Sequence, residues 1–235
     1  MHIISTNEFE AICNDPSTRV LKYGKSLDQP KVFEKKSDTI IKLFYAKKTL
    51  WSSDHIYPRA RRFAANVKKL HAHGFSVPII SETQFCPDLK IHLLYYAKLA
   101  GQDVRYLAKN GHADTITAVA KLLADLHGKG IFFRSIHLEN LLYDQNSSTF
   151  SLLDVTDVRF KNYSLSVYLR YRNIRHLLQE PHDQQIWKAY GVQDFMQEYF
   201  KESDLSAYSR KMLDWLVQRF TAALTPSQTS FANQD

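Results

Sequence analysis

The sequence predicts an α+β fold with two lobes, a small antiparallel β N-lobe with one main helix and a mainly helical C-lobe. Two observations support this prediction. The first third of the chain contains short segments rich in β-branched and aromatic residues, separated by turn-like residues, which is typical of an antiparallel meander. From residue 113 onwards, apolar residues instead recur at helical spacing. Five strands are expected, at residues 18–24, 30–36, 39–46, 77–85 and 90–99.

The change of pattern divides the chain into three parts. We expect residues 1–98 to form the N-lobe and residues 99–224 to form the C-lobe. Residues 225–235 are polar and are expected to be a disordered tail. The N-lobe helix is expected at residues 58–73, where Gly74 provides a stop signal. Its core-facing side chains would be Ala60, Phe63, Val67 and Leu70.

The C-lobe is expected to contain five helices and one small hairpin. The hairpin comprises strands at 140–144 and 150–155 around a polar turn. Trp187, Trp215 and Phe220 have apolar neighbours at helical spacing, so we expect all three in the core. The helices are expected at residues 113–130, 166–180, 183–191, 192–200 and 209–224.

Composition limits the classes of function. Of the 235 residues, 44% are hydrophobic, which is enough for a globular fold. The start, "MHIISTNEFEAIC", is not expected to be a signal peptide, and the short apolar stretch broken by Lys98 is not expected to span a membrane. Cys13 and Cys86 match no metal or redox motif, so they are interpreted as free thiols in a reducing cytosol. The formal net charge of +7 favours anionic partners.

Lys42 is a candidate phosphate-binding residue. It lies in the middle of the third strand, where alternation puts it on the same face as Ile40 and Phe44. A cation on an apolar face needs a partner, and a phosphate group in a cleft would supply one. The alternative is an edge-strand lysine whose ammonium group reaches water.

Asn140 and Asp154 are candidate metal ligands. Asn140 begins the first strand of the predicted hairpin, and Asp154 follows the apolar run "FSLL". The hairpin brings these strand ends to one edge, where a carboxylate and an amide oxygen suit a magnesium ion. The alternative is that both side chains cap turns.

The segment "GIFFRSIHLEN…FSLLDVTDVRF" resembles the catalytic loop and metal-binding segment of the protein-kinase-like fold. The likeness is greatest to bacterial lipopolysaccharide core kinases that phosphorylate Kdo or heptose, including toluene-tolerance proteins, and extends over residues 18–200. It implies that ATP is the phosphate donor, that Lys42 binds its phosphates, and that Asn140 and Asp154 bind magnesium.

The chain departs from the family's pattern at the centre of this loop. Ser135 occupies the position of the family's catalytic aspartate, and Phe133 that of a histidine. A general base contributes about 10² to 10⁴ in rate, so its loss predicts a slow enzyme. His137 and Asp157 are two candidate replacements. The alternatives are a loop histidine bonded to the backbone and a surface aspartate paired with Arg159.

A second departure concerns the N-lobe helix. In the family a glutamate from this helix holds the lysine, but the chain has no acidic residue between Asp54 and Glu82. Phe63 takes the glutamate position, and Asn66 follows one turn later. Lys42 is therefore expected to pair with Asp154, with Asn66, or with the nucleotide alone.

Two more features concern the nucleotide and the loop. The segment "KYGKSLDQP" contains only Gly24, where the family has three glycines, so its backbone offers a poorer cradle for phosphate. Arg134, next to Ser135, keeps the basic residue of the family's loop.

Two basic clusters indicate binding. One, on the N-lobe helix, is either a solvated face or a docking face for an anionic bilayer or a phosphorylated glycan. The other, "YLRYRNIRH", either suits a phosphosugar or nucleic acid, or is a helix with its arginines outward. The clusters consist of Arg59, Arg61, Arg62, Lys68 and Lys69, and of Arg170, Arg172, Arg175 and His176.

These features favour an ATP- and magnesium-dependent phosphotransferase that acts on a sugar hydroxyl of lipopolysaccharide core. The alternative is an impaired pseudokinase that binds nucleotide or a protein partner and regulates envelope biogenesis. We expect an anionic glycolipid or phosphosugar substrate and no nucleic acid, because no recognised nucleic-acid-binding motif accompanies the charge. We expect a cytoplasmic location, either unattached or peripheral at the inner membrane of a Gram-negative bacterium.

Overall fold

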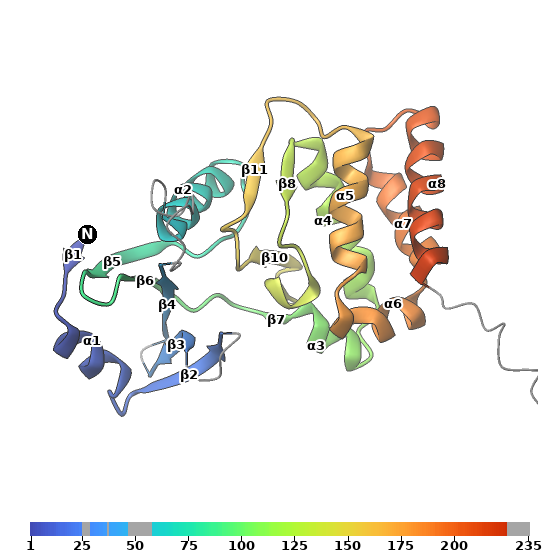
Figure 1. Ribbon diagram of the computed structural model, residues 1–235. Helices are drawn as coiled ribbons and strands as arrows, with labels where there is room; N and C mark the ends of the chain where they lie inside the picture. Colours follow the sequence, from blue (N-terminus) through green and yellow to red (C-terminus); the bar gives the residue numbers. More distant parts are fainter. Residues whose placement is uncertain (25–28, 37, 47–57, 225–235) are drawn as a thin grey trace, which may run out of the picture. The chain divides into compact units, whose positions relative to one another are not determined.

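The computed structural model describes residues 1–24, 29–36, 38–46 and 58–224 (Figure 1). The chain forms two compact units, which we describe separately. Unit 1 comprises Met1–Gln102 and Leu142–Asp157, and unit 2 comprises Asp103–Leu141 and Val158–Asp235. The predicted lobe boundary after residue 98 stays a prediction, and the predicted tail lies outside the described residues. The predicted α+β class, with an antiparallel-rich sheet first and helices after it, is confirmed.

Unit 1 is built on a six-stranded sheet with the strand order β1-β5-β6-β4-β3-β2. The strands are β1 (His2–Ile3), β2 (Thr18–Tyr23), β3 (Pro30–Lys35), β4 (Thr39–Tyr45), β5 (Ile80–Cys86) and β6 (Ile91–Ala97). Neighbouring strands are antiparallel except β1, which pairs parallel with β5. All five predicted strands are present. In the central strand β4, Lys42 lies opposite Val32 of β3 and Leu94 of β6.

One face of this sheet packs against α1 (Thr6–Cys13), which the sequence analysis did not predict. The helix begins with a capping box, in which Ser5 and Glu8 satisfy each other's backbone amides. Its Phe9 joins a buried cluster with Ile41, Leu43 and residues of the neighbouring strands. A helix of eight residues with one buried anchor gives too short a periodicity to be recognised from sequence.

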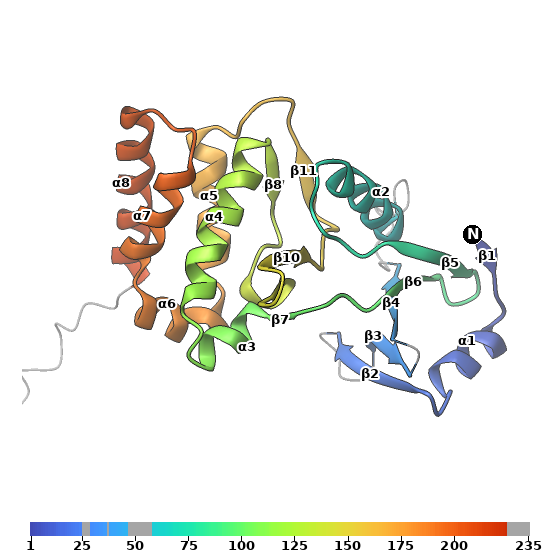
Figure 2. The same cartoon turned by 180° about the vertical axis from the view of Figure 1, so that it is seen from behind.

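The other face packs against α2 (Arg59–Ala72), the predicted N-lobe helix. All four predicted core-facing side chains are buried, as helical spacing requires. Phe63, which is fully buried, contacts Phe44 of β4 and Tyr96 of β6, with ring centroids 5.6 and 6.5 Å away. Figures 1 and 2 show α2 beside the β5–β6 side of the sheet. The face that carries Lys42 is therefore covered by an apolar helix surface.

The predicted hairpin is formed by β9 (Leu141–Asp144) and β10 (Thr149–Leu152), which share a sheet with β7 (Gln102–Asp103). Ser76 fastens it to the rest of unit 1, because its carbonyl accepts from the amide of Leu152 and its hydroxyl bonds Ser151 at 2.8 Å. Gly101 has a φ of 97°, and a Cβ there would lie 2.7 Å from the backbone of Tyr143. Only glycine permits this approach.

Unit 2 is mainly helical. In both views α4 lies beside α7, and α5 beside α8 (Figures 1 and 2). A short strand pair, β8 with β11, and two 3₁₀ turns were not predicted. The elements are α3 (Val104–Lys109), α4 (Asp114–Gly128), β8 (Ile131–Phe133), η1 (Leu138–Asn140), β11 (Val158–Phe160), α5 (Val167–Leu178), η2 (Pro181–Asp183), α6 (Gln184–Tyr190), α7 (Val192–Glu202) and α8 (Ala207–Leu224).

Two predictions about single side chains in unit 2 are wrong. Trp187 is buried as expected, but Trp215 is 54% exposed on α8. Arg170 of α5 neither points outward nor is accessible to a ligand. It is fully buried, and its guanidinium donates to the hydroxyl of Tyr199 and to Asp204. None of the helices in the described part of the chain has the length and apolar character that a membrane crossing requires.

Candidate active site

Lys42 lies on the α2-facing side of β4 and is largely enclosed, with its side chain 13% exposed. Its ammonium nitrogen lies 4.7 Å from the ring centroid of Phe63 and 5.6 Å from that of Phe44. Both distances are within the range of a cation–π interaction, which is worth about 0.5–2 kcal/mol. Phe63, in the position that the resemblance gives to a glutamate, therefore contacts the lysine through its π face instead of a carboxylate.

The acidic partner of Lys42 is Asp154. The Nζ–Oδ1 distance is 2.9 Å, and both residues belong to unit 1. The sequence left Asp154, Asn66 and the nucleotide alone as possible partners of Lys42. In the structure Lys42 forms an ion pair with Asp154. The same Oδ1 accepts a hydrogen bond of 2.8 Å from the hydroxyl of Thr156. The carboxylate is fixed by these two donors immediately after β10.

Asn66 holds the backbone that follows Asp154. Its Nδ2 donates to the carbonyl oxygens of Val155 at 2.8 Å and Thr156 at 3.1 Å. α2 is thereby attached to the aspartate segment by a neutral amide, and to Lys42 by an aromatic ring. This arrangement explains how a helix with no acidic residue can still organise the lysine and the aspartate.

Burial and charge act in opposite directions on this pair. Burial disfavours the aspartate anion, but Lys42, the Thr156 hydroxyl and the positive charge of Arg59 outweigh it, so the pKa of Asp154 is lowered. Burial also lowers the pKa of Lys42, and Asp154 only partly offsets that effect. The aspartate is therefore ionised at neutral pH, as a metal ligand needs to be.

The residues of the predicted catalytic loop lie in unit 2, where Asn140 ends η1 and is 6% exposed. Its Nδ2 donates to the carbonyl oxygen of Ser135 at 2.9 Å and contacts Nε2 of His137 at 2.8 Å. The carbonyl accepts only, so it fixes which way the amide faces. Oδ1 is then the atom with which Asn140 would ligate a metal.

The same geometry assigns the state of His137. Because Nδ2 of Asn140 is a donor, Nε2 of His137 accepts, and the neutral ring carries its proton on Nδ1. A general base needs an available lone pair, and the Nε2 lone pair is engaged by Asn140. This contact favours His137 as a support for Asn140 over His137 as a replacement base.

A polar pocket of about 370 Å³ adjoins the loop within unit 2. Arg134, Ser135 and His137 form one side of it. That this loop lies next to the end of α5 was not predicted, since the two segments are far apart in the chain. The pocket is lined by Arg134, Ser135, Ile136, His137, His176, Gln179, Glu180 and Pro181.

Arg105 of α3 helps to fix η1 in place, and its role was not predicted from the sequence. Its Nε donates to Asp183, which is fully buried, and its Nη1 donates to Glu139 at 2.9 Å. Asp183 also accepts from the backbone amide of Leu138 at 3.3 Å. A partly buried arginine that binds two acids on different turns holds the residues around Asn140 in one arrangement.

A second buried network holds the start of the loop. Asn173 of α5 bonds both backbone groups of Phe133, accepting from its amide at 3.1 Å and donating to its carbonyl at 2.7 Å. His127 lies between Asn173, at 3.2 Å from Nε2, and the hydroxyl of Tyr199, at 2.8 Å from Nδ1. Burial, helped by the charge of Arg170, lowers the pKa of His127 to about 3, so the ring is neutral.

The roles of all the predicted site residues stay predictions, those of Gly24 and Asp157 among them. The amide of Gly24 donates to the carbonyl of Gln29 at 2.7 Å, and residues 25–28 of the predicted phosphate loop lie outside the described residues. Asp157 is half-buried, three residues after Asp154. Within the described residues, no group of three histidine, cysteine or acidic side chains could hold a metal by itself. A carboxylate and an amide oxygen nevertheless fit magnesium, which usually takes one or two protein ligands together with substrate phosphates.

Comparison with known proteins gives matches among solved structures alone, because no family model and no curated protein matches the chain. A structure described as WaaP in complex with acyl carrier protein shows 13% identity and a TM-score of 0.43, covering 79% of this chain and 88% of that one. The Cydia pomonella granulovirus kinase PK-1 shows 13% identity and a TM-score of 0.41, over 90% and 92% of the two chains.

The bifunctional kinase-methyltransferase WbdD shows 16% identity and a TM-score of 0.47, over 81% of this chain. This chain spans just under half of WbdD, at 47%. Two of the three descriptions name kinases. Identities and scores of this size assign no activity.

Proposed function

We propose that the chain is a kinase-like phosphotransferase that moves the γ-phosphoryl group of ATP, with magnesium, to a sugar hydroxyl of lipopolysaccharide core, either Kdo or heptose. The observation that carries the proposal is the 2.9 Å contact between Lys42 and Asp154 within unit 1. It joins two residues far apart in sequence, a cation suited to phosphate and a carboxylate suited to magnesium.

In this proposal each residue has one task. Lys42 would neutralise charge on the nucleotide phosphates, and Asp154 and Asn140 would hold the magnesium ion. That ion would neutralise the charge that develops on the phosphate oxygens. The acceptor oxygen bonds to the γ-phosphorus, the bond from that phosphorus to the bridging oxygen breaks, and ADP leaves.

The hydroxyl proton has no carboxylate at the usual position. Since Nε2 of His137 is engaged by Asn140, Ser135 and Asp157 are the stronger candidates to orient the acceptor. Phosphoryl transfer passes through a loose transition state in which proton removal contributes modestly, so the reaction is expected to be slow but not abolished.

We place the acceptor in the polar pocket beside the loop. Arg134, His176, Gln179 and Glu180 offer donors and acceptors in a small space, which suits a polyhydroxylated sugar. Arg134 would meet an acidic group such as a phosphate or the carboxylate of a sugar acid. The substrate class is therefore an anionic glycolipid or phosphosugar.

The exposed basic side chains of α2 support a peripheral position at the inner membrane. Arg61, Lys68 and Lys69 all reach the surface on a helix that has no acidic residue. Such a face is attracted by about 1 kcal/mol per cation to an anionic bilayer. Co-sedimentation with anionic vesicles, lost in the triple glutamine variant, would support this location.

The function is tested by turnover. Purified protein, ATP and magnesium are incubated with a lipid A–core extract, and phosphate transfer to the glycolipid is followed by mass spectrometry. We expect slow transfer that disappears in Asp154→Ala and in Lys42→Met. Transfer that persists in both variants would contradict the assignment of these residues.

A second function, a pseudokinase that binds nucleotide or a protein partner and regulates envelope assembly, is favoured by specific departures. Ser135 lacks a carboxylate, Phe63 replaces an acid, and the amide of Gly24 is already bonded to the carbonyl of Gln29. Nucleotide binding that depends on Asp154, without transfer to any core sugar, would select this function over the first.

A further inference from the structure

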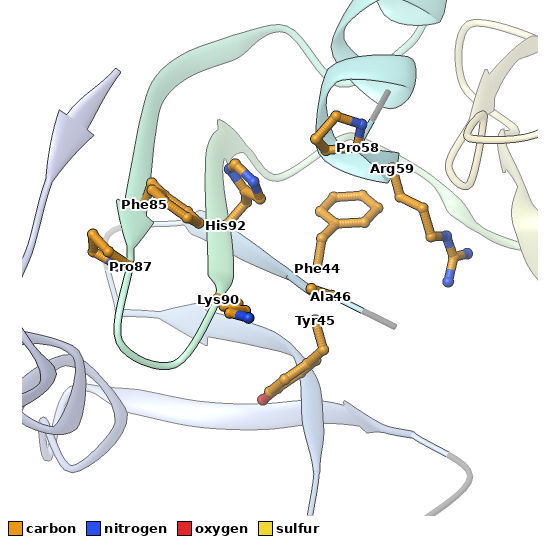
Figure 3. A pocket seen from close by; sticks show the side chains of 9 residues that line it. All are labelled: Phe44, Tyr45, Ala46, Pro58, Arg59, Phe85, Pro87, Lys90 and His92. Atoms are coloured by element: carbon orange, nitrogen blue, oxygen red, sulfur yellow. The ribbon is translucent and has the colours of Figure 1, made fainter. Parts of the chain in front are cut away.

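Unit 1 contains a pocket of about 280 Å³ that the proposed function does not use. It lies between the end of β4, the β5–β6 hairpin and the beginning of α2 (Figure 3). Its volume is near the lower end of the range for small-molecule sites. The lining residues are Phe44, Tyr45, Ala46, Pro58, Arg59, Phe85, Pro87, Lys90 and His92.

The walls of the pocket are mainly apolar and aromatic. Phe85 and His92 stack with their ring centroids 4.4 Å apart and an interplanar angle of 25°, which makes one flat wall. Phe44 forms another wall, with Pro58 beside it, as Figure 3 shows. Rigid rings cost little conformational entropy when a ligand is bound, and they offer large contact area.

The charged groups around the pocket share one sign. Arg59 extends past Phe44 at one end, and Lys90 lies below His92 at the other (Figure 3). Among the described residues, no acidic side chain lines the pocket. The nearby Asp88 instead accepts a hydrogen bond from Thr6. An anionic group in the pocket would meet a cation without an opposing carboxylate.

We propose that this pocket binds a small anionic amphiphile, with an apolar body of one or two rings or a short acyl segment and a carboxylate, phosphate or sulfonate group. The small volume excludes a folded domain, and the apolar walls exclude a free inorganic anion. Burial, with a contribution from Arg61, lowers the pKa of His92, so at neutral pH the ring serves as a wall and the charge comes from Lys90 and Arg59.

The pocket shares residues with the surroundings of Lys42. Phe44 lies beneath the Lys42 ammonium group, and Arg59 contributes to the lowered pKa of Asp154. The proposal is nevertheless independent of the phosphotransferase function, because it concerns binding of an amphiphile and needs no nucleotide.

The probe for this site is 1-anilinonaphthalene-8-sulfonate, which combines fused rings with a sulfonate. We expect a saturable fluorescence increase with one site per chain, reversed by octyl phosphate and not by octyl glucoside at the same submicellar concentration. No saturable binding, or equal displacement by the neutral glycoside, would overturn the proposal. Unchanged circular dichroism would confirm that the dye reports a folded chain.

Substitutions of residues that line the pocket test whether the dye binds there. Ala46→Leu fills the pocket without removing a contact and is expected to weaken binding at least tenfold. Lys90→Asn, which tolerates the left-handed backbone at this position (φ 53°), and Arg59→Gln remove the charges. At least one of them should weaken binding about fivefold, the effect of one ion pair of about 1 kcal/mol. Lys36→Gln, at an exposed position of unit 1 to which no role is assigned, is the matched control and should leave binding unchanged.

The same variants distinguish two sources of the amphiphile. If soluble molecules are the ligand, octyl phosphate binds wild-type protein tightly and Ala46→Leu poorly, while binding to phosphatidylglycerol vesicles is equal for the two. If a lipid is the ligand, Ala46→Leu lowers vesicle binding as well. Octyl phosphate binding that is unaffected by Ala46→Leu would contradict the claim that the amphiphile binds in this pocket.

Discussion

At the scale of single residues, the most informative feature is how Lys42 is held. In this chain a phenylalanine lies where the resemblance places a glutamate, and it contacts the lysine through its ring. Asp154 supplies the charge, at 2.9 Å, and Asn66 supplies the hydrogen bonds to the aspartate segment. The sequence indicated all three residues, but it could not choose among the partners, since that choice depends on where Asp154, 112 residues later in the chain, is placed.

The contact between Phe63 and Lys42 predicts a coupling energy. Phe63→Leu and Lys42→Met, made singly and together, should show non-additive losses of unfolding free energy, with a coupling of about 0.5–2 kcal/mol. Denaturant unfolding measures each value. Phe9→Leu, on the opposite face of the sheet, is the control partner, and its coupling to Lys42→Met should stay below about 0.5 kcal/mol. Equal couplings for the two phenylalanines would contradict the cation–π contact.

At the scale of elements, helical periodicity predicted α2 and the long helices of unit 2 correctly, because burial on one face leaves a repeating pattern. Short elements such as α1 and β8 left no pattern. The burial of Arg170 was also beyond sequence reasoning. It depends on Tyr199 and Asp204, which come from α7 and from the loop that follows it.

The turn between α4 and β8 predicts opposite effects for two neighbouring glycines. Gly130 has a φ of 75°, and a Cβ there would lie 2.5 Å from the carbonyl oxygens of Lys161 and Tyr163. Gly130→Ala should therefore lower the unfolding free energy by about 1–3 kcal/mol. Gly128→Ala, at the end of α4 with nothing within 4 Å, should raise it by about 0.4–1 kcal/mol. Changes of the same sign in thermal or denaturant unfolding would contradict this turn geometry.

The buried His127 predicts how unit 2 responds to acid. Its pKa is about 3 in the folded chain, against 6.5 when unfolded. The unfolded state therefore binds a proton that the folded state does not, and stability falls as pH drops from about 6.5 towards 3. One such group contributes up to about 1.4 kcal/mol per pH unit.

Denaturant unfolding between pH 7 and 4, followed by the fluorescence of Trp187 and Trp215 in this unit, measures the slope. His127→Gln should reduce it by about one proton, whatever its effect on stability at pH 7. His182→Gln, at an exposed position, should leave the slope unchanged. An unaltered slope in His127→Gln would show that the histidine does not titrate as its burial requires.

At the scale of the whole molecule, the sequence predicted that a sheet precedes a series of helices. Which segments belong to which of the two units was harder to predict. The hairpin Leu142–Asp157 belongs by its contacts to unit 1, although both of its neighbours in sequence belong to unit 2. Asp154 thereby belongs to the unit that contains Lys42, while Asn140 belongs to the helical unit. The sequence pattern does not show that the chain returns to unit 1 here. The return is fixed by the hydrogen bond that the Leu152 amide donates to the carbonyl of Ser76, and by the one that Asn66 donates to the carbonyl of Val155.

The central claim is that Lys42 and Asp154 form a site for ATP and magnesium, and thermal unfolding with and without these ligands tests it most directly. At a ligand concentration of about 100 times Kd, binding should add about 2.7 kcal/mol to the unfolding free energy and raise Tm by several degrees. The increase should require magnesium, vanish in Asp154→Ala and Lys42→Met, and persist in Lys68→Gln. The absence of a magnesium-dependent increase in the wild-type chain, or its persistence in Asp154→Ala, would contradict the claim.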